Sequence, residues 1–228
     1  MSAREPVFSA AVEDYAKAIY ALERRGDGTA VSTNALAERL AVTPGSASGM
    51  VRKLAELGLV THEPYRGVQL TPKGVRVALE VLRHHRLLEL YLAESLGVPW
   101  DRVHDEAEVL EHVLSEELEA LIAAKLGNPT HDPHGDPIPS ADLTIDEQPT
   151  LPLEALGAGE RGRFVRVSDS DPDMLRYLAE RGISPGDEVE VVDKQPFDGP
   201  VFARFGDNVQ VLGGALAHAM RVELAESA

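Results

Sequence analysis

The sequence contains no cysteine among its 228 residues. A disulfide framework and a thiolate metal site are therefore excluded, and any metal ion must be bound by oxygen and imidazole nitrogen atoms. No apolar run approaches the roughly 20 residues that a membrane-spanning helix requires. Residues 1–11 include Arg4, Glu5 and Pro6 and have no apolar signal core. We therefore expect a cytoplasmic protein without a membrane partner, long enough for one large domain or two small ones.

Positive charge is scarce, since the net charge is −16. Residues 1–75 carry 9 Lys and Arg against 8 Asp and Glu, or +1. Residues 76–150 carry 5 against 16, or −11, and residues 151–228 carry 8 against 14, or −6. The acidity lies outside the first third, where a locally basic face can still bind DNA. The acidic middle third is either a solvated helix face or a cation site.

The first third has the pattern of a winged helix-turn-helix. Apolar periodicity and capping residues predict helices over 12–22, 33–40 and 43–57, then strands at 59–62 and 67–70. The third helix would enter the major groove of double-stranded DNA, with the turn between the strands reaching the flanking backbone. The predicted contact residues are Thr43, Ser46, Ser48, Gly49, Arg52, Lys53 and Arg66. The alternative is a helix-hairpin unit that is used for protein contacts.

The rest of the chain predicts an α+β protein. Two longer helices are expected over about 72–96 and 101–126, and residues 128–150, rich in Pro, Asp, Gly and Thr, read as a loop and linker. Period-two segments follow, with strand candidates at 164–167, 188–192, 201–204 and 209–212 and a short helix at 172–181. Several short strands with Gly and Pro turns suggest a small β-barrel.

Ligand-type side chains recur at helical spacing in the middle third. On an ideal helix, one stripe of about 100° would carry four of them and the apolar residues would lie opposite. The four are His104, Glu108, Glu111 and His112. A solvated face would normally include Lys or Arg, but residues 103–124 contain neither. Because so many acids repel one another without a cation, the spacing favours a metal site.

The preceding helix supplies a second pair, His85 and Glu89, which are four residues apart on one face. Such a pair is often a surface ion pair, but a neighbouring antiparallel helix would bring His104 beside it. Spacing alone does not choose between His84 and His85. The chain has no His-Glu-x-x-His motif, no Ser/His/Asp arrangement and no Gly-rich phosphate loop.

These motifs resemble the diphtheria toxin repressor family of iron- and manganese-dependent regulators. The shared features are Glu-Asp-Tyr and Ile-Tyr within 13–20, the winged helix, Arg-His-His-Arg-Leu-Leu-Glu at 83–89, the acidic His-containing segment 103–115, and Gly-Asp-Pro-Ile-Pro at 135–139. The resemblance implies a DNA-binding domain (1–74), a helical dimerisation and metal-binding domain (75–140), a linker (141–150) and a barrel of the Src-homology-3 type (151–228). It also implies a homodimer that binds operator DNA in response to a metal ion.

The resemblance also implies a primary metal site. Its ligands would be Asp14, Glu108, Glu111 and His112. Iron-type relatives have Met and Cys at the first two positions, whereas manganese-type relatives have carboxylates, as this chain does. Because Mn²⁺ prefers oxygen ligands, the sequence predicts Mn²⁺, with Fe²⁺ as the alternative. Lys17 occupies a position where a binuclear manganese regulator has a Glu ligand, which argues against two ions.

An ancillary site is implied as well, with the ligands His85, Glu89, His104 and Asp171. Met174 replaces an amide ligand of the family, so the contribution of the barrel is open. The loop histidines His131 and His134 are interpreted as non-ligands.

Three functions remain open from the sequence: a Mn²⁺-activated repressor of metal-uptake genes, an Fe²⁺-responsive repressor, and a winged-helix dimer that needs no metal. A di-metal helical enzyme is an alternative of a different class, but it would need an open coordination site and acid/base residues that the sequence does not offer. Leu87, Leu90, Tyr91 and the apolar face of the metal helix supply more apolar surface than one small domain needs. They predict a two-fold dimer built from residues near 90–125.

Overall fold

A computed structural model describes residues 8–26, 28–63, 66–197 and 199–224 of the chain. Its contacts divide the chain into two compact units. The first unit comprises Met1–His85, Val109–Glu116 and Pro139–Thr144, and the second comprises Arg86–Glu108, Glu117–Ile138 and Ile145–Ala228. Helix α4 (Pro72–Leu96) is continuous and contributes to both units. The expected division at residues 74, 140 and 150 therefore stays a prediction.

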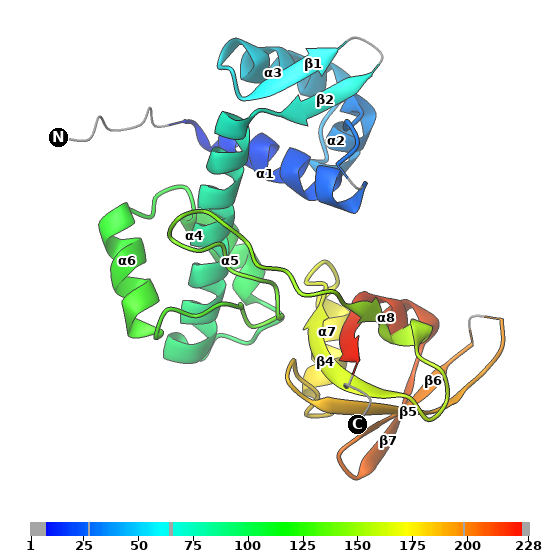
Figure 1. Cartoon of the computed structure of the whole chain (residues 1–228). Helices are drawn as coiled ribbons and strands as arrows, with labels where there is room; N and C mark the ends of the chain where they lie inside the picture. The colour runs from blue at the N-terminus through cyan, green and yellow to red at the C-terminus, as the bar shows by residue number, and fades with distance from the viewer. Residues whose placement is uncertain (1–7, 27, 64–65, 198, 225–228) are drawn as a thin grey trace. The chain divides into compact units, whose positions relative to one another are not determined.

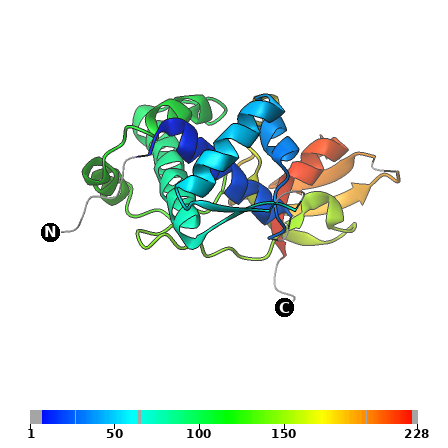
Figure 2. The ribbon, with the colours of Figure 1, turned by 90° about the horizontal axis from the view of Figure 1, so that it is seen from above.

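The first unit begins with the expected winged helix-turn-helix. It contains helices α1 (Ala10–Arg25), α2 (Thr33–Arg39) and α3 (Pro44–Glu56) and the antiparallel hairpin of β1 (Val60–Glu63) and β2 (Gly67–Leu70). Figures 1 and 2 show the three helices packed together with the hairpin beside them. The expected turn of the hairpin includes Pro64 and Tyr65, which lie outside the described residues.

Local sequence explains where these helices start and which faces they bury. Ser32 and Thr43 precede α2 and α3, and each side chain accepts a hydrogen bond from the backbone N–H three residues later. Leu36 of α2 and Val51 and Leu54 of α3 are fully buried. The opposite face of α3 is therefore exposed to solvent.

The helical region differs from the prediction of one helix over 101–126. It forms two helices, α5 (Val103–Leu110) and α6 (Glu116–Lys125), separated by a turn. The N–H of Val113 donates to the carbonyl of Leu110 at 3.1 Å, a three-residue turn that replaces the four-residue spacing of an α-helix. Glu111 and His112 therefore leave the helical stripe on which their spacing placed them.

The C-terminal segment is an antiparallel sheet. Its strands are β3 (Leu151–Pro152), β4 (Arg161–Val167), β5 (Glu188–Lys194), β6 (Val201–Phe205), β7 (Asn208–Leu212) and β8 (Met220–Leu224). Their order is β3-β8-β4-β5-β6-β7. The short helices that accompany the sheet are η1 (Leu153–Ala155), α7 (Pro172–Ala179) and α8 (Gly214–Ala219). The sheet corresponds to the expected small barrel of the Src-homology-3 type, but it is not closed: within the described residues β3 and β7 are edge strands.

Each unit has its own apolar core. The core of the first unit includes Ile19 and Leu36, and that of the second is built around Phe164 and Val191 of the sheet. Trp100 packs against the second core and donates its indole N–H to the carbonyl of Leu175 at 3.2 Å. Among the described residues, no helix has both the length and the apolar character to cross a membrane.

Candidate metal centres

The first cluster joins α1 to the turn after α5. The side chains of Asp14, Glu111 and His112 each offer one ligand-type atom, and these atoms lie within 4.8 Å of one another. Nε2 of His112 is 2.9 Å from Oδ1 of Asp14 and 3.4 Å from Oε1 of Glu111. Three of the four residues expected in the primary site thus meet within the first unit.

A neighbouring carboxylate orients the imidazole of His112. Oε2 of Glu13 lies 2.6 Å from Nδ1 of His112, and because a carboxylate accepts, Nδ1 is the protonated nitrogen. The other ring nitrogen, Nε2, faces Asp14 and Glu111 and would be the atom that binds a metal ion. A histidine that ligates a metal typically donates its other N–H to a carboxylate in this way.

Glu111 is fully buried, and both of its carboxylate oxygens contact side-chain nitrogens. Its Oε1 is 2.6 Å from Nζ of Lys17, and its Oε2 is 2.5 Å from Nδ1 of His85. Burial raises the pKa of Glu111, but the hydrogen bond to His85 and the charge of Lys17 outweigh burial and lower this pKa below its ordinary value. The carboxylate is therefore held ionised at neutral pH. His84, the alternative to His85, instead contacts the backbone carbonyl of Glu111 at 3.1 Å.

The fourth expected primary ligand, Glu108, lies on α5 in the second unit. There its Oε1 is 3.8 Å from Nε2 of His104, one helical turn earlier. Its membership of the first cluster stays a prediction.

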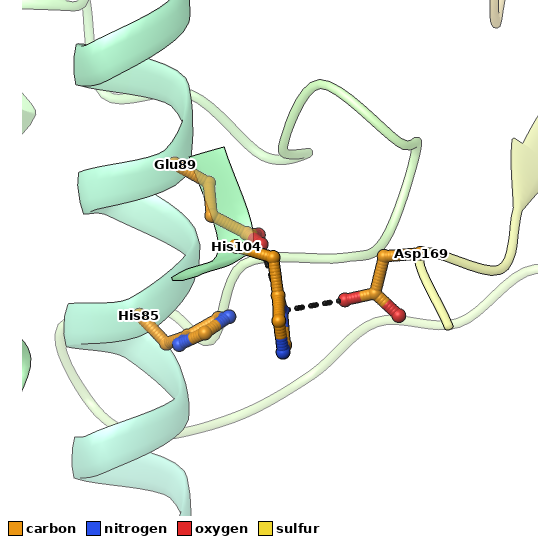
Figure 3. A group of neighbouring side chains, drawn as sticks. All are labelled: His85, Glu89, His104 and Asp169. Atoms are coloured by element: carbon orange, nitrogen blue, oxygen red, sulfur yellow. Dashed lines mark ion pairs between the residues drawn. The ribbon is translucent and has the colours of Figure 1, made fainter. Parts of the chain in front are cut away.

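The second cluster lies in the second unit and combines α4, α5 and the loop after β4. Nδ1 of His104 is 3.0 Å from Oδ2 of Asp169 and 3.4 Å from Oε1 of Glu89. Figure 3 shows His104 with the carboxylate of Asp169 directed at its ring and Glu89 beside it. The hydrogen bonds to Asp169 and Glu89 raise the pKa of His104 to about 10. A proton here occupies the place that a metal cation could take.

The aspartate that lies in this cluster is not the one expected from the sequence. Asp171 was expected, but its side chain caps α7, where it accepts a hydrogen bond from the N–H of Asp173 at 3.0 Å. Asp169, two residues earlier, lies beside His104 instead. Met174 packs against the core of the sheet. His85, the other expected ligand, lies one turn before Glu89 on α4, and its membership stays a prediction (Figure 3).

A buried histidine that the sequence predicted not to be a ligand extends the second cluster, because its group of ligand-type residues also contains Glu89. Ligand-type atoms of Glu89, Asp132 and His134 lie within 4.8 Å of one another, and all three residues are buried. Nε2 of His134 donates to the carbonyl of Trp100 at 2.8 Å. Its Nδ1 has no hydrogen-bond partner among the described residues and lies 3.8 Å from Oε2 of Glu89. A buried imidazole nitrogen without a hydrogen-bond partner, close to two carboxylates, is an environment that favours a cation.

The electrostatic surroundings of Asp132 also favour a bound cation. Burial and the nearby charge of Asp136 raise the pKa of Asp132 well above its ordinary value, although Arg86 opposes this at 3.8 Å. The sequence periodicity does not predict this group of ligand-type residues, because Asp132 and His134 lie in an irregular loop. The only sequence signal is the tripeptide Asp132-Pro133-His134, which is weak evidence for a metal site. His131, by contrast, is exposed and hydrogen-bonds to the hydroxyl of Thr130.

The expected DNA-contact residues share the surface of α3. Ser46, Gly49, Arg52 and Lys53 are exposed, and Ser48 is half-buried. A Cβ added at Gly49 would meet nothing within 4 Å, so another molecule can approach the backbone closely at this position. Arg66 is exposed at the hairpin, 3.2 Å from Glu63. The arrangement presents a polar and basic helix face that fits a DNA groove.

Comparison with known proteins identifies the family. Three family models match in order: "Iron dependent repressor, N-terminal DNA binding domain" at residues 7–68, "Iron dependent repressor, metal binding and dimerisation domain" at 71–140, and "FeoA domain" at 151–224. The diphtheria toxin repressor of Corynebacterium efficiens is 34% identical over 221 residues, covering 92% of this chain and 94% of that protein. The chain belongs to the diphtheria toxin repressor family.

Other relatives of this family respond to different metals. The iron-dependent repressor IdeR of Mycobacterium tuberculosis is 33% identical, with 92% of this chain and 96% of that protein covered. A solved structure described as a manganese-dependent transcriptional repressor in complex with manganese is 43% identical, with a TM-score of 0.84, and covers 94% of this chain and all of that chain. The manganese regulator SloR is 30% identical, with a TM-score of 0.74 and coverage of 94% and 98%. The protein is thus a metal-dependent transcriptional repressor and not an enzyme.

Proposed function

We propose that this repressor is activated by Mn²⁺ bound by Asp14, Glu111 and His112, with Glu108 as the fourth ligand. The observation that carries the proposal is the convergence of the first three, two carboxylates and one imidazole, within 4.8 Å. Without sulfur the donor set suits a hard divalent ion. The likeness to a manganese-dependent repressor supports the same ion. The alternative is Fe²⁺, which iron-dependent relatives favour.

The second cluster is proposed as an ancillary site for the same class of ion. Glu89, His104 and Asp169 would hold the ion together with Asp132 and His134, and His85 is the remaining candidate on α4. The lone pair of His134 without a partner and the raised pKa of Asp132 support this assignment. A divalent cation there would add positive charge beside three carboxylates that now share His104 and Arg86.

The primary cluster is proposed to control DNA binding through α1. Asp14 lies on a helix of the winged-helix domain, whereas Glu111 and His112 lie in the turn beyond α5. Residues held together by a common cation would fix α1 against that turn and so fix the orientation of α3. Operator DNA would then bind a protein in which α3 is already oriented. Metal binding and DNA binding would therefore be coupled. A coupling of about 1–3 kcal/mol is typical of allosteric proteins, or roughly 5–150-fold in operator affinity.

The partners are proposed to be a second copy of the chain and double-stranded operator DNA in the cytoplasm. Thr43, the exposed residues of α3 and Arg66 would contact DNA. Of the residues expected in the dimer, Leu87 and Leu90 are buried within the chain itself. Val109, Val113 and Leu121 are instead 72%, 76% and 62% exposed, which supports an apolar interface around α5 and α6. A stable monomer in sedimentation at micromolar concentration would contradict the dimer.

Operator binding measured in EDTA and across Mn²⁺, Fe²⁺, Co²⁺ and Zn²⁺ tests the function. We expect binding in Mn²⁺ to be roughly 5–150-fold tighter than in EDTA. Stronger activation by Fe²⁺ at free concentrations near those in cells would favour the iron-responsive alternative. Equal binding in EDTA would favour a winged-helix dimer that needs no metal.

A further inference from the structure

Lys17 places a permanent positive charge inside the primary cluster. It lies on α1, three residues after Asp14, and its Nζ is 2.6 Å from Oε1 of Glu111. The Lys17 side chain is 17% exposed and that of Glu111 is 0% exposed. An ion pair with so little solvent around it is only weakly screened, so its charge is felt by any other cation at the cluster.

The ion pair between Lys17 and Glu111 reduces the net negative charge of the primary cluster. Among the described residues of the first unit, the cluster and its contacts contain the carboxylates Glu13, Asp14 and Glu111. Lys17 already balances one of these three charges before any metal binds. A divalent cation that shares Glu111 must therefore approach an ammonium group, and the repulsion opposes binding.

The same contact has a second effect in the protein without metal. Glu111 is fully buried, and a buried carboxylate without a partner is strongly destabilising. Lys17 and His85 occupy its two oxygens. The ion pair also ties α1 to the turn that contains Glu111. Lys17 therefore keeps Glu111 ionised and close to Asp14, while it competes with the metal for the charge of that carboxylate.

We propose that Lys17 is an internal counter-cation that positions Glu111 and sets the Mn²⁺ concentration at which the regulator responds. The inference rests on the proposed primary site. A neutral side chain at position 17 should make metal binding tighter and the metal-free protein less stable. A lysine that merely stabilised the fold would produce only the second effect.

The test compares Lys17→Met with the wild-type residue by calorimetric titration with Mn²⁺. All proteins carry Glu89→Gln, which removes the carboxylate common to the groups of the second cluster and so leaves the primary site to be measured. Lys17→Arg keeps the charge, and Lys125→Met removes an equal charge from an exposed residue of α6. Lys17→Gln serves if Lys17→Met fails to fold. Thermal unfolding in EDTA is recorded for each protein.

We expect Lys17→Met to bind Mn²⁺ at least about tenfold more tightly, because the repulsion is gone. Its unfolding temperature in EDTA should fall, since Glu111 loses one of its two partners. Lys17→Arg and Lys125→Met should keep an affinity within roughly threefold of the reference, a change below the 1.4 kcal/mol that corresponds to a factor of ten.

Unchanged or weaker Mn²⁺ binding by Lys17→Met overturns the inference, whatever happens to the unfolding temperature. Glu111→Gln in the same background separates the two proposals. If it binds Mn²⁺ as tightly as the reference, the primary site itself is assigned incorrectly and the role of Lys17 fails with it.

Discussion

The two clusters of ligand-type side chains differ in how completely their polar atoms are paired with neighbouring groups. In the primary cluster, both oxygens of Glu111 contact side-chain nitrogens, of Lys17 and of His85, and both nitrogens of His112 face carboxylates. In the second cluster, Nδ1 of His134 has no partner among the described residues, and Asp132 has a raised pKa. Lys17 thus takes the place of an ion in the primary cluster. The second cluster, although His104 is protonated, keeps one buried imidazole nitrogen without a hydrogen-bond partner among the described residues.

For the two metal sites proposed above, the difference predicts two separate roles of the bound ion. A site whose residues are already paired gains little stability from an ion, so its binding energy can be coupled to the position of α1. A site with an unsatisfied buried histidine gains more, because the cation removes an existing electrostatic penalty. We therefore assign the switch to the primary cluster and stabilisation of the second unit to the other.

The largest expected effect is the loss of switching in His112→Ala. Removing the imidazole takes away the one nitrogen donor and the contact between the turn and α1. Metal-dependent operator binding should then disappear, a loss of roughly 5–150-fold in affinity in Mn²⁺. Fluorescence anisotropy with operator DNA measures it. Glu106→Ala, which removes an exposed side chain of α5, is the control and should bind as the wild type does.

His134→Ala should separate stability from switching. Mn²⁺ at about 100 times its dissociation constant stabilises a folded protein by about 2.7 kcal/mol for each site, and this variant should lose most of the share contributed by the second cluster. Its operator response to Mn²⁺ should change less than that of His112→Ala. Thermal unfolding with and without Mn²⁺ gives the first quantity, and His131→Ala is the exposed control. An equal loss of switching in both histidine variants would remove the distinction between the clusters.

A smaller effect is expected on metal choice. Asp14→Met replaces a hard oxygen by a soft thioether, so the Mn²⁺ affinity should fall while the Fe²⁺ affinity is better retained. We expect the ratio of the two dissociation constants to move toward Fe²⁺ by about tenfold, or about 1.4 kcal/mol. Anaerobic competition titrations measure this ratio. An unchanged ratio would mean that Asp14 does not bind the ion.

The smallest effect concerns His104 and pH. Its pKa is raised to about 10 by Asp169 and Glu89, so the protonated pair stabilises the fold below the unfolded pKa of about 6.5 and loses this contribution as pH rises through about 10. His104→Gln should therefore destabilise the protein in EDTA at pH 6 more than at pH 10. Urea unfolding at both values provides the comparison. A difference between variant and wild type that does not depend on pH would show that the ion pair contributes nothing.

Much of the fold could be predicted because it depends on local patterns. The capping residues Ser32 and Thr43 and the periodic apolar residues locate α2 and α3, and α4 begins at Pro72 as expected. The break after Leu110 was missed, since Glu111 and His112 are compatible with a continuing helix. That the sheet does not close could not be predicted, because the pairing of strands such as β3 and β8 depends on contacts between distant segments.

The candidate sites were predictable where their residues repeat at helical spacing or match a family motif. Glu89 and His104 are of the first kind, and Asp14 is of the second. Asp169 and His134 lie in irregular segments, where sequence spacing does not determine which side chains meet. Lys17 was recognised as a departure from a binuclear pattern, but its ion pair with Glu111 follows only from the three-dimensional structure.

Hydrogen exchange of α1 tests the central claim most directly. We expect Mn²⁺ to increase the protection of residues 10–25 in the wild-type protein and to leave it unchanged in His112→Ala, with α7 serving as an internal reference. Equal protection of α1 in EDTA and in Mn²⁺, together with equal operator binding, would contradict the account and make the metal purely structural.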